Sequence, residues 1–154
     1  MARDEQVGRG LLTADHVLEY PYTRSVGPVV GRFLGELRER RIVGVRTAAG
    51  EVLVPAMEYD PANGEAVTGE FTEVGPAGVV TAWSWVVKPR SKQPLARAFA
   101  WALIKLDGAD TAMLHAVDVE SPEHMRTGLR VTARWREKTV GMITDIECFE
   151  PEKD

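Results

Sequence analysis

The chain has a single cysteine, no long apolar run and no signal-peptide pattern at its start. It has 154 residues and one cysteine, Cys148, so no disulfide can form within the chain, and this composition suits a reducing compartment. No apolar run approaches the roughly 18 to 20 residues of a membrane span. The charged first residues, MARDEQVGRG, do not resemble a signal peptide. We therefore expect a cytoplasmic protein with no membrane partner.

Positive charge is also in short supply. There are 19 lysines and arginines against 23 aspartates and glutamates, so the formal net charge is −4. Because phosphate backbones are bound by clustered cations, this balance argues against a nucleic-acid partner, although it leaves room for one small basic pocket. The hydrophobic share of 44% and the length are enough for one core, in a single domain or in a small domain with an appendage.

A short helix is predicted from Pro28 onward, in the sequence PVVGRFLGELRERR. Val30, Phe33, Leu34 and Leu37 recur at steps of three and four residues and form one apolar stripe. This stripe packs either on its own domain or on a partner protein. Phe33 and Leu37 are therefore candidate residues of a partner interface. The residues before the helix, 1–27, are expected to form an N-terminal arm.

A β-hairpin is predicted after the helix, with IVGVR and EVLVP as its strands around a turn at residues 47–50. A two-stranded hairpin is marginally stable by itself. We expect its valines to pack on the following domain or on another protein chain, and we favour another chain. The helix and hairpin together form the predicted unit 28–66.

The segment 67–154 alternates apolar and polar side chains as strands do. In its clearest stretch, GLRVTARWRE, Val131, Ala133 and Trp135 point one way, and the connection SPEHMRTG is long enough for one helical turn. Five strands with a helical connection between the third and fourth are the layout of an OB-fold barrel, so we predict a mainly β fold. The predicted strands are 78–88, 98–106, 111–119, 128–137 and 141–149.

The stretch RTAAGEVLVPAMEYDPANGE resembles the frame of a rubredoxin-like zinc ribbon, CxxCG…PxxxxCPxCG, in which the cysteines are missing. Arg46, Ala49, Asp60 and Asn63 stand where the ligands would be. A tetrahedral zinc site needs four sulfur or nitrogen donors of a kind that arginine and alanine do not supply. The ribbon is therefore predicted to be degenerate and free of metal, with no zinc and no other cofactor expected.

The order of the elements also resembles one known family. Over about residues 28–151, the chain resembles the ribbon-plus-OB family, once called a domain of unknown function. The matching elements come in the same order: a helix, the ribbon frame, GVVTAWSWVV, a strand with an LDG turn, GLRV and an aromatic-x-Pro ending (Phe149, Pro151). Members of this family accompany thiolase-like or aldolase enzymes in acyl-CoA metabolism. The resemblance implies an accessory, non-catalytic subunit that stabilises such a complex and helps to bind the CoA thioester, with steroid or lipid degradation as the kind of pathway it suggests.

A basic segment lies between the first two predicted strands. KPRSKQPLAR contains Lys88, Arg90, Lys92 and Arg97 and no acidic residue. OB-folds often bind ligands with this loop. The four cations are therefore candidates for holding the phosphates of coenzyme A through charge-assisted hydrogen bonds. The alternative is a solvated loop that pairs with acids on a partner or with nothing.

The tryptophans also allow two interpretations. Trp83, Trp85 and Trp135 alternate with polar residues, as side chains of a barrel core do, and some of them are candidates to anchor a partner, Trp83 and Trp85 in particular. Aromatic residues on an OB-fold can instead stack on nucleic-acid bases. A nucleic-acid-binding OB module is therefore one alternative function.

A catalytic set is missing from the sequence. His115 lies inside a predicted strand, which favours a satisfied and partly buried histidine over a catalytic one. Cys148 lies among acidic residues, which would raise the pKa of its thiol and disfavour a nucleophile. His124 could act as an acid or base, but it stands in a connecting segment without a partner motif. A stand-alone acyl-CoA hydratase or thioesterase is thus a further, disfavoured alternative.

Overall fold

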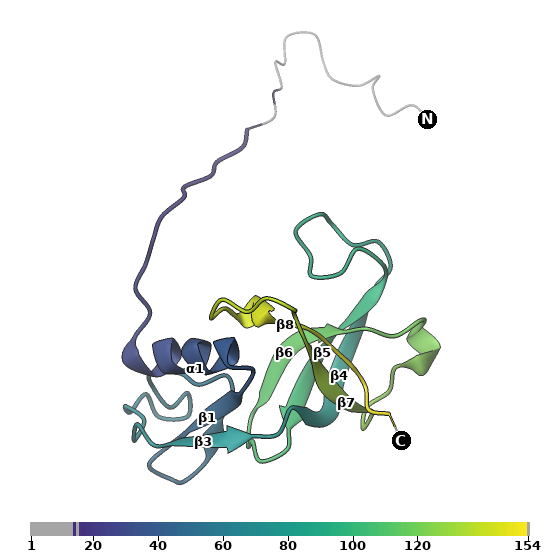
Figure 1. Ribbon diagram of the computed structural model, residues 1–154. Coiled ribbons are helices and arrows are strands. Elements are labelled where there is room, and N and C mark those ends of the chain that lie inside the picture. Colours follow the sequence, from purple (N-terminus) through teal and green to yellow (C-terminus); the bar gives the residue numbers. More distant parts are fainter. Residues whose placement is uncertain (1–13, 15, 154) are drawn as a thin grey trace, which may run out of the picture.

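The computed structural model describes residue 14 and residues 16–153, and a small sheet with its helix lies beside a β-barrel in it (Figure 1). The elements of the first part are α1 (Pro28–Arg38), β1 (Ile42–Arg46), β2 (Val52–Leu53) and β3 (Phe71–Val74). The barrel contains β4 (Ala77–Val86), β5 (Phe99–Leu106), β6 (Ala112–Val117), β7 (Arg130–Trp135) and β8 (Ile146–Pro151). Two 3₁₀ turns, η1 (Pro122–His124) and η2 (Ile143–Asp145), lie in its connections.

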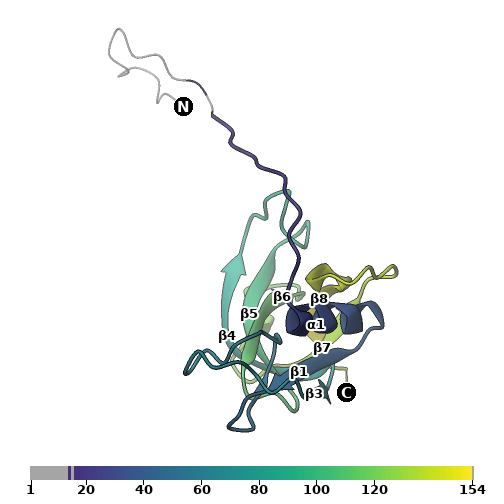
Figure 2. The same ribbon diagram turned by 90° about the vertical axis from the view of Figure 1, so that its left-hand side faces the viewer.

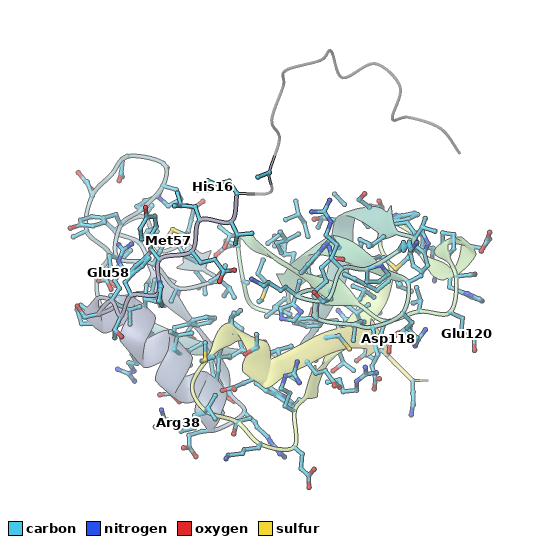
Figure 3. The ribbon with its side chains drawn as sticks, turned by 90° about the horizontal axis from the view of Figure 1, so that it is seen from above. His16, Arg38, Met57, Glu58, Asp118 and Glu120 are labelled. Carbon is cyan, nitrogen blue, oxygen red and sulfur yellow. The ribbon has the colours of Figure 1, made fainter. Side chains whose placement is uncertain are left out.

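The helix begins where its sequence predicts, at Pro28, because proline needs no hydrogen-bond acceptor at the first helical position. The side chain of Glu58 caps this end, since its Oε1 accepts the backbone N–H of Val29 at 2.9 Å and of Val30 at 3.1 Å (Figure 3). A Cβ on Gly27 would displace that carboxylate, so a larger residue there would disturb the cap.

The buried face of α1 packs on this chain's own core. It consists of Val29, Phe33 and Leu37, four residues apart, whereas the predicted stripe contained Val30. Phe33 is 2% exposed and Leu37 is 0% exposed, so neither side chain is available to a partner. The prediction that these two residues form a partner interface is therefore wrong, and the alternative of packing within the domain is correct.

The other end of α1 is fastened to the connection between β7 and η2. Arg38 donates through Nη2 to the carbonyl of Val140 at 3.0 Å, and the Thr139 hydroxyl donates to the Arg38 carbonyl at 2.7 Å. The helix ends at Arg38 rather than continuing through the two following arginines, because the backbone turns at Arg40, where φ is +57°.

The predicted hairpin is part of a three-stranded sheet with the order β2-β1-β3. β3 was not predicted, and it pairs with β1 over Ile42↔Val74 to Val45↔Phe71. β2 is held by the turn between β5 and β6: Val52 donates to Asp110 Oδ2 at 2.8 Å, and Val54 donates to Thr111 Oγ1 at 2.8 Å. The hairpin is thus supported by its own barrel, and the preference for another chain was wrong.

The five-stranded barrel predicted from the sequence is confirmed, with the strand order β4-β5-β6-β8-β7. It closes between β6 and β8 through a single parallel pair, Val117↔Phe149, so this seam is open on either side of the pair. The last strand begins at Ile146, later than expected, because residues 141–145 form the turn around Asp145 that contains η2. Within the described residues, no helix has the length and hydrophobicity to cross a bilayer.

Candidate functional site

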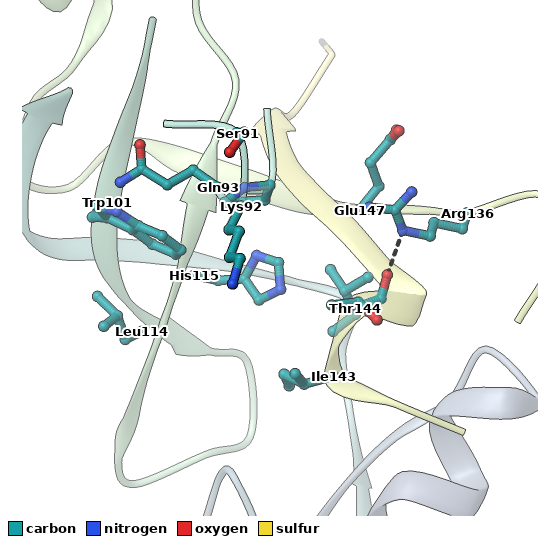
Figure 4. Close-up of a pocket in the computed structure, with 12 residues that line it drawn as sticks. Ser91, Lys92, Gln93, Trp101, Leu114, His115, Arg136, Ile143, Thr144 and Glu147 are labelled. Carbon is teal, nitrogen blue, oxygen red and sulfur yellow. Dashed lines mark hydrogen bonds between the residues drawn. The ribbon is translucent and has the colours of Figure 1, made fainter. Parts of the chain in front are cut away.

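A pocket of about 510 Å³ lies against the barrel at the open seam (Figure 4). Its walls are the loop between β4 and β5 and the turn η2, and its floor is formed by β5 and β6. In an OB-fold these are the second and third strands and the two loops that flank them, which is where such folds bind ligands. The lining residues are Ser91, Lys92, Gln93, Pro94, Trp101, Leu114, His115, Arg136, Ile143, Thr144, Ile146 and Glu147.

The floor of the pocket is apolar. Trp101 points outward from β5 and is fixed by an edge-on contact with Phe99, with ring centroids 5.3 Å apart. Leu114 on β6 and Ile143 in η2 leave much of their side chains exposed beside it. Register explains this arrangement, because Leu114 lies opposite Leu103 of β5 and residues paired across strands share one face of the sheet. The outer face of β5 and β6 is therefore apolar around Trp101, Leu103 and Leu114, as the inner face of these strands is.

His115 lies at the seam and forms a buried corner of the pocket. Its Nδ1 accepts the backbone N–H of Ala116 at 2.9 Å, and its ring meets Phe149 edge-on. Burial lowers the pKa of the imidazole below its ordinary value, although hydrogen bonds with the backbone of Ile143 and Ala116 oppose the shift. The ring is thus neutral at pH 7 with its Nδ1 lone pair occupied, which confirms the satisfied histidine expected from the sequence and disfavours a general base.

The rim of the pocket is polar and carries two cations. Arg136 donates through Nε to the carbonyl of Thr144 at 2.7 Å, which links the end of β7 to η2. Lys92 stands on the opposite side, in a tight turn where Gln93 donates to the Arg90 carbonyl at 3.0 Å and accepts the Arg90 N–H through Oε1 at 2.8 Å. An apolar floor between two cations suits an amphiphilic anion, because burial of the apolar part and charge-assisted contacts to the anion then act together.

The four cations predicted to bind phosphate are not brought together. Lys92 lines the pocket, and Lys88 and Arg90 are exposed on the same loop. Arg97 lies elsewhere: its guanidinium pairs with Asp118 and donates to the Val119 carbonyl at 3.3 Å, beside a smaller pocket near η1. A phosphate site that includes Arg97 would have to break this ion pair. Three of the four cations thus remain together on the loop, Lys92 among them in an exposed pair with Glu19.

Asp118 and Arg134 explain why Arg97 is engaged. The side chain of Asp118 is nearly buried, and its Oδ2 accepts Arg134 Nη2 at 3.0 Å, while Arg97 covers the other oxygen. Arg134 also donates to Glu147 at 2.8 Å and to Glu150 at 3.0 Å. These long-range pairs between β7, β8 and the end of β6 were not predicted. They make a structural network on the barrel wall, because every charge in it has a partner.

Trp83 and Trp85 lie at the far end of β4. A bulge after Val80 shifts the pairing, so that Trp83 faces Ala102 and Trp85 faces Ala100, both on the inner side of the sheet. Trp85 is half-buried against the core, whereas Trp83 is 36% exposed because the strand extends past the end of the barrel. Their part in a partner interface stays a prediction, and Trp83 offers more surface for it than Trp85 does.

The zinc-ribbon frame persists as two backbone turns whose side chains do not fit a metal. Arg46 donates to the Gly50 carbonyl at 3.1 Å, and Ala49 has no ligand atom. The Oδ1 atoms of Asp60 and Asn63 accept backbone N–H groups at 2.8 Å each. These four groups do not form a zinc-binding donor set. Across residues 16–153, we find no cluster of three or more histidine, cysteine or acidic side chains that could hold a metal ion.

Cys148 is buried behind the pocket, in a small cluster with Phe99 and Ala116. Burial raises the pKa of its thiol to about 12, with Arg134 acting against the shift and the nearby carboxylates adding to it. The sequence predicted a raised thiol pKa and the structure agrees, but burial raises this pKa more than the acidic neighbours do. A protonated, inaccessible thiol is a poor nucleophile.

Comparison with known proteins identifies the barrel. Residues 71–136 match the profile of the family described as ChsH2, C-terminal OB-fold domain. Over this range the chain is similar to the ChsH2 C-terminal OB-fold family. The matched range includes β5, β6 and the loop between β4 and β5, which together form most of the pocket.

Solved structures show the same fold beyond the matched range of the ChsH2 family. The chain aligns with a structure described as Ltp2-ChsH2(DUF35) aldolase with a TM-score of 0.60 and 19% identity, over 84% of this chain and 98% of the other. It aligns with a DUF35-family protein of unknown function from Sulfolobus solfataricus with a TM-score of 0.55 and 20% identity, over 70% of this chain and 77% of that one. No curated protein sequence matches this chain significantly.

Proposed function

We propose that this protein is a non-catalytic accessory subunit of a thiolase-like acyl-CoA enzyme. The match of residues 71–136 to the ChsH2 C-terminal OB-fold family carries this proposal. Fold similarity to a structure whose description names a DUF35 protein together with an aldolase supports it. The partner would carry out a thiolase, acyltransferase or retro-aldol reaction, for example on thioesters from steroid or lipid degradation.

The side chains around the pocket support a non-catalytic role. His115 is neutral with one ring nitrogen occupied, and the Cys148 thiol is buried with a pKa of about 12. A nucleophile or base for thioester chemistry needs an accessible, ionisable group near pH 7. The reactive residue of the complex would therefore belong to the partner, and this subunit would stabilise the complex and shape the thioester site.

The pocket itself suits one end of a CoA thioester. An acyl chain could lie on the apolar floor at Trp101 and Leu114, and phosphates could be bound from the β4–β5 loop by Lys88, Arg90 and Lys92. Charge-assisted hydrogen bonds from such cations are roughly twice as strong as neutral ones. A site shared between this loop and the partner would explain why the pocket is open on one side.

A nucleic-acid-binding OB module is the second candidate, because Trp101 stands on the strand pair where OB-folds stack bases. The net charge of −4 opposes it, since counterion release needs clustered cations. Titration with a single-stranded oligonucleotide separates the two candidates: affinity that falls steeply with salt would favour the module over the subunit.

Co-expression tests the proposed function directly. The full chain should be produced together with the thiolase-like protein encoded by a neighbouring reading frame and passed over a size-exclusion column. Co-elution at a fixed stoichiometry is the expected result, together with thioester turnover that the partner alone lacks or performs more slowly. A protein that is stable and monomeric alone and never co-elutes with such a partner would refute the proposal.

A further inference from the structure

We propose that residues 16–26, which we call the tyrosine segment, are the part of the chain that the thiolase-like partner binds. This inference rests on the function proposed above and names the contact that would hold the complex together. The segment HVLEYPYTRSV precedes α1 and contains neither helix nor strand. Figures 1 and 2 show it running out from the N-terminal end of α1.

The composition of the tyrosine segment is that of a binding element and not of a spacer. Flexible spacers are rich in glycine, serine and charged residues and poor in aromatic ones. This segment instead holds two of the three tyrosines of the chain. Leu18 is 64% exposed, Tyr20 is 73% exposed and Tyr22 is 79% exposed, so most of the surface of these side chains is not buried by their own domain. Tyrosine is among the residues most enriched at the energetic centres of protein interfaces.

The spacing of these side chains favours an extended binding mode. Leu18, Tyr20 and Tyr22 occur at every second position, so they lie on one side of an extended backbone. Pro21 restricts the residue before it to extended conformations, and its own φ is fixed, so less conformational entropy is lost when the segment is ordered. A partner with an open sheet edge or an apolar groove could accept such a strand and bury its three side chains.

The base of the tyrosine segment is rigid. Gly27 follows it directly and lies against the Glu58 carboxylate that caps α1, so the point at which the segment leaves the domain is fixed. Tyr59, the third tyrosine, follows Glu58 and is also mostly exposed. A further exposed tyrosine thus stands on the folded domain, next in sequence to the residue that caps α1 at the base of the segment.

The tyrosine segment and the pocket lie on the same side of the molecule. Glu19 stands between Leu18 and Tyr20, and its Oε1 lies 3.4 Å from Nζ of Lys92 on the pocket rim. An exposed pair of this kind contributes little energy, but it locates the segment next to the β4–β5 loop. Leu18 and Tyr20 lie on the side of the segment opposite to Glu19, so a partner that buries them would hold the segment from outside, beside the β4–β5 loop and the pocket. This proximity is why we assign the segment to the partner that shares the thioester site.

The test compares three forms of the full chain in co-purification and in affinity measurements with the partner. The first is the unchanged protein. The second carries Leu18→Ala, Tyr20→Ala and Tyr22→Ala, and the matched control carries Thr23→Ala, Arg24→Ala and Ser25→Ala in the same segment. All three should have the same melting temperature, because neither set of side chains belongs to the core. The apolar variant should bind the partner about tenfold more weakly or worse, while the control binds normally.

Several outcomes are informative. Loss of binding in the apolar variant alone supports the inference, and protection of residues 16–26 from hydrogen exchange in the complex strengthens it. If the unchanged protein binds and the apolar variant binds equally well, the inference fails and the proposed function survives. If the unchanged protein never binds a thiolase-like partner, both fail. Finally, if the apolar variant abolishes a homodimer, the segment binds a second copy of the chain. If residues 16–26 are protected in the isolated monomer, the segment binds its own pocket. Either result overturns the assignment to the partner.

Discussion

The carboxylate of Asp145 accepts the backbone N–H of Gly141 at 2.7 Å and so fixes the turn that carries one wall of the pocket. The same carboxylate accepts the N–H groups of Val140 at 3.0 Å and Met142 at 3.1 Å. Asp145 is almost fully buried, so three donors that would otherwise lack a partner are satisfied by one side chain. Ile143 and Thr144, which line the pocket, lie inside this closed turn.

Replacing Asp145 with asparagine should destabilise the protein and loosen the pocket. The amide has one acceptor oxygen and presents an N–H₂ group to backbone donors, so about 2 kcal/mol of the free energy of unfolding should be lost. Urea titration would measure this. Glu137→Gln, at an exposed position in the same connection, is the matched control and should change little. Equal stability of the two variants would contradict the role given to Asp145.

The effect of Asp145 should also depend on pH. Burial works to raise the pKa of this carboxyl, but the three N–H donors outweigh it and lower the pKa below its ordinary value. A group whose pKa is lower in the folded protein stabilises the fold above its unfolded pKa of about 3.9 and ceases to do so as the pH falls through the folded pKa. The difference in melting temperature between the wild type and Asp145→Asn should thus be constant near pH 7 and shrink below about pH 4. A difference that grows in acid would contradict this assignment.

The ion pairs of Asp118 and of Asp107 should contribute unequally to the free energy of unfolding. Asp118 is nearly buried between Arg97 and Arg134, so Asp118→Ala removes a desolvated acceptor of two charged bonds and should cost about 2 to 3 kcal/mol. Asp107 binds Arg130 through two bonds of 2.7 Å, but both side chains are about half exposed. Water and salt screen that pair, so Asp107→Ala should cost much less. Similar losses for both variants in urea titration would refute this ranking.

Gly35 and Gly78 differ in how much room the structure leaves for a side chain. A Cβ at Gly35, on the exposed face of α1, would meet nothing within 4 Å, so Gly35→Ala should stabilise the protein by about 0.5 to 1 kcal/mol. A Cβ at Gly78 would lie 2.7 Å from the Leu106 Cα, the residue with which Gly78 pairs at the first position of the β4–β5 register. The two strands would have to separate, so Gly78→Ala should cost about 3 kcal/mol or more. Thermal unfolding of both variants measures the contrast, and a neutral Gly78→Ala would show that the strands can separate freely.

The parts of the fold that follow from local sequence were predictable, and those that depend on distant contacts were not. The alternation around Val131 and Trp135 predicted a strand, and the five-strand pattern predicted the barrel. β3 was missed because its four residues, FTEV, carry too short a pattern to stand out, and only pairing with β1 makes them a strand. The start of β8 was misplaced because Asp145, five residues after Val140, closes a turn through backbone contacts that alternation does not reveal.

The site was predictable only in part, for a similar physical reason. The loop with Lys88, Arg90 and Lys92 was found because clustered charge is visible in sequence, but the partner of Arg97 lies 21 positions away. Trp101 was missed because its strand, FAWALIKL, is apolar on both faces, so alternation does not show which side faces solvent. The side of the sheet that Trp83 faces was set by a bulge at Thr81, which a regular period of two does not anticipate.

The cations of the β4–β5 loop should matter for thioester binding by the complex, if the proposed function holds. Changing Lys88, Arg90 and Lys92 together to alanine should weaken acyl-CoA affinity about tenfold or more, because it removes the charge-assisted contacts to phosphate that the loop can offer. Arg97 is left unchanged in this variant, because its bond to Asp118 belongs to the barrel wall and its removal would confuse binding with stability.

The matched control removes three other exposed cations, through Lys105→Ala, Arg126→Ala and Lys153→Ala, and so reaches the same net charge. Calorimetric titration of each complex with an acyl-CoA at two ionic strengths separates local contacts from the overall field. Weaker binding in the loop variant alone, with a smaller dependence on salt, is the expected result. Equal weakening in both variants would mean that net charge and not the loop attracts the ligand. Unchanged affinity in the loop variant would show that the phosphates are held by the partner alone.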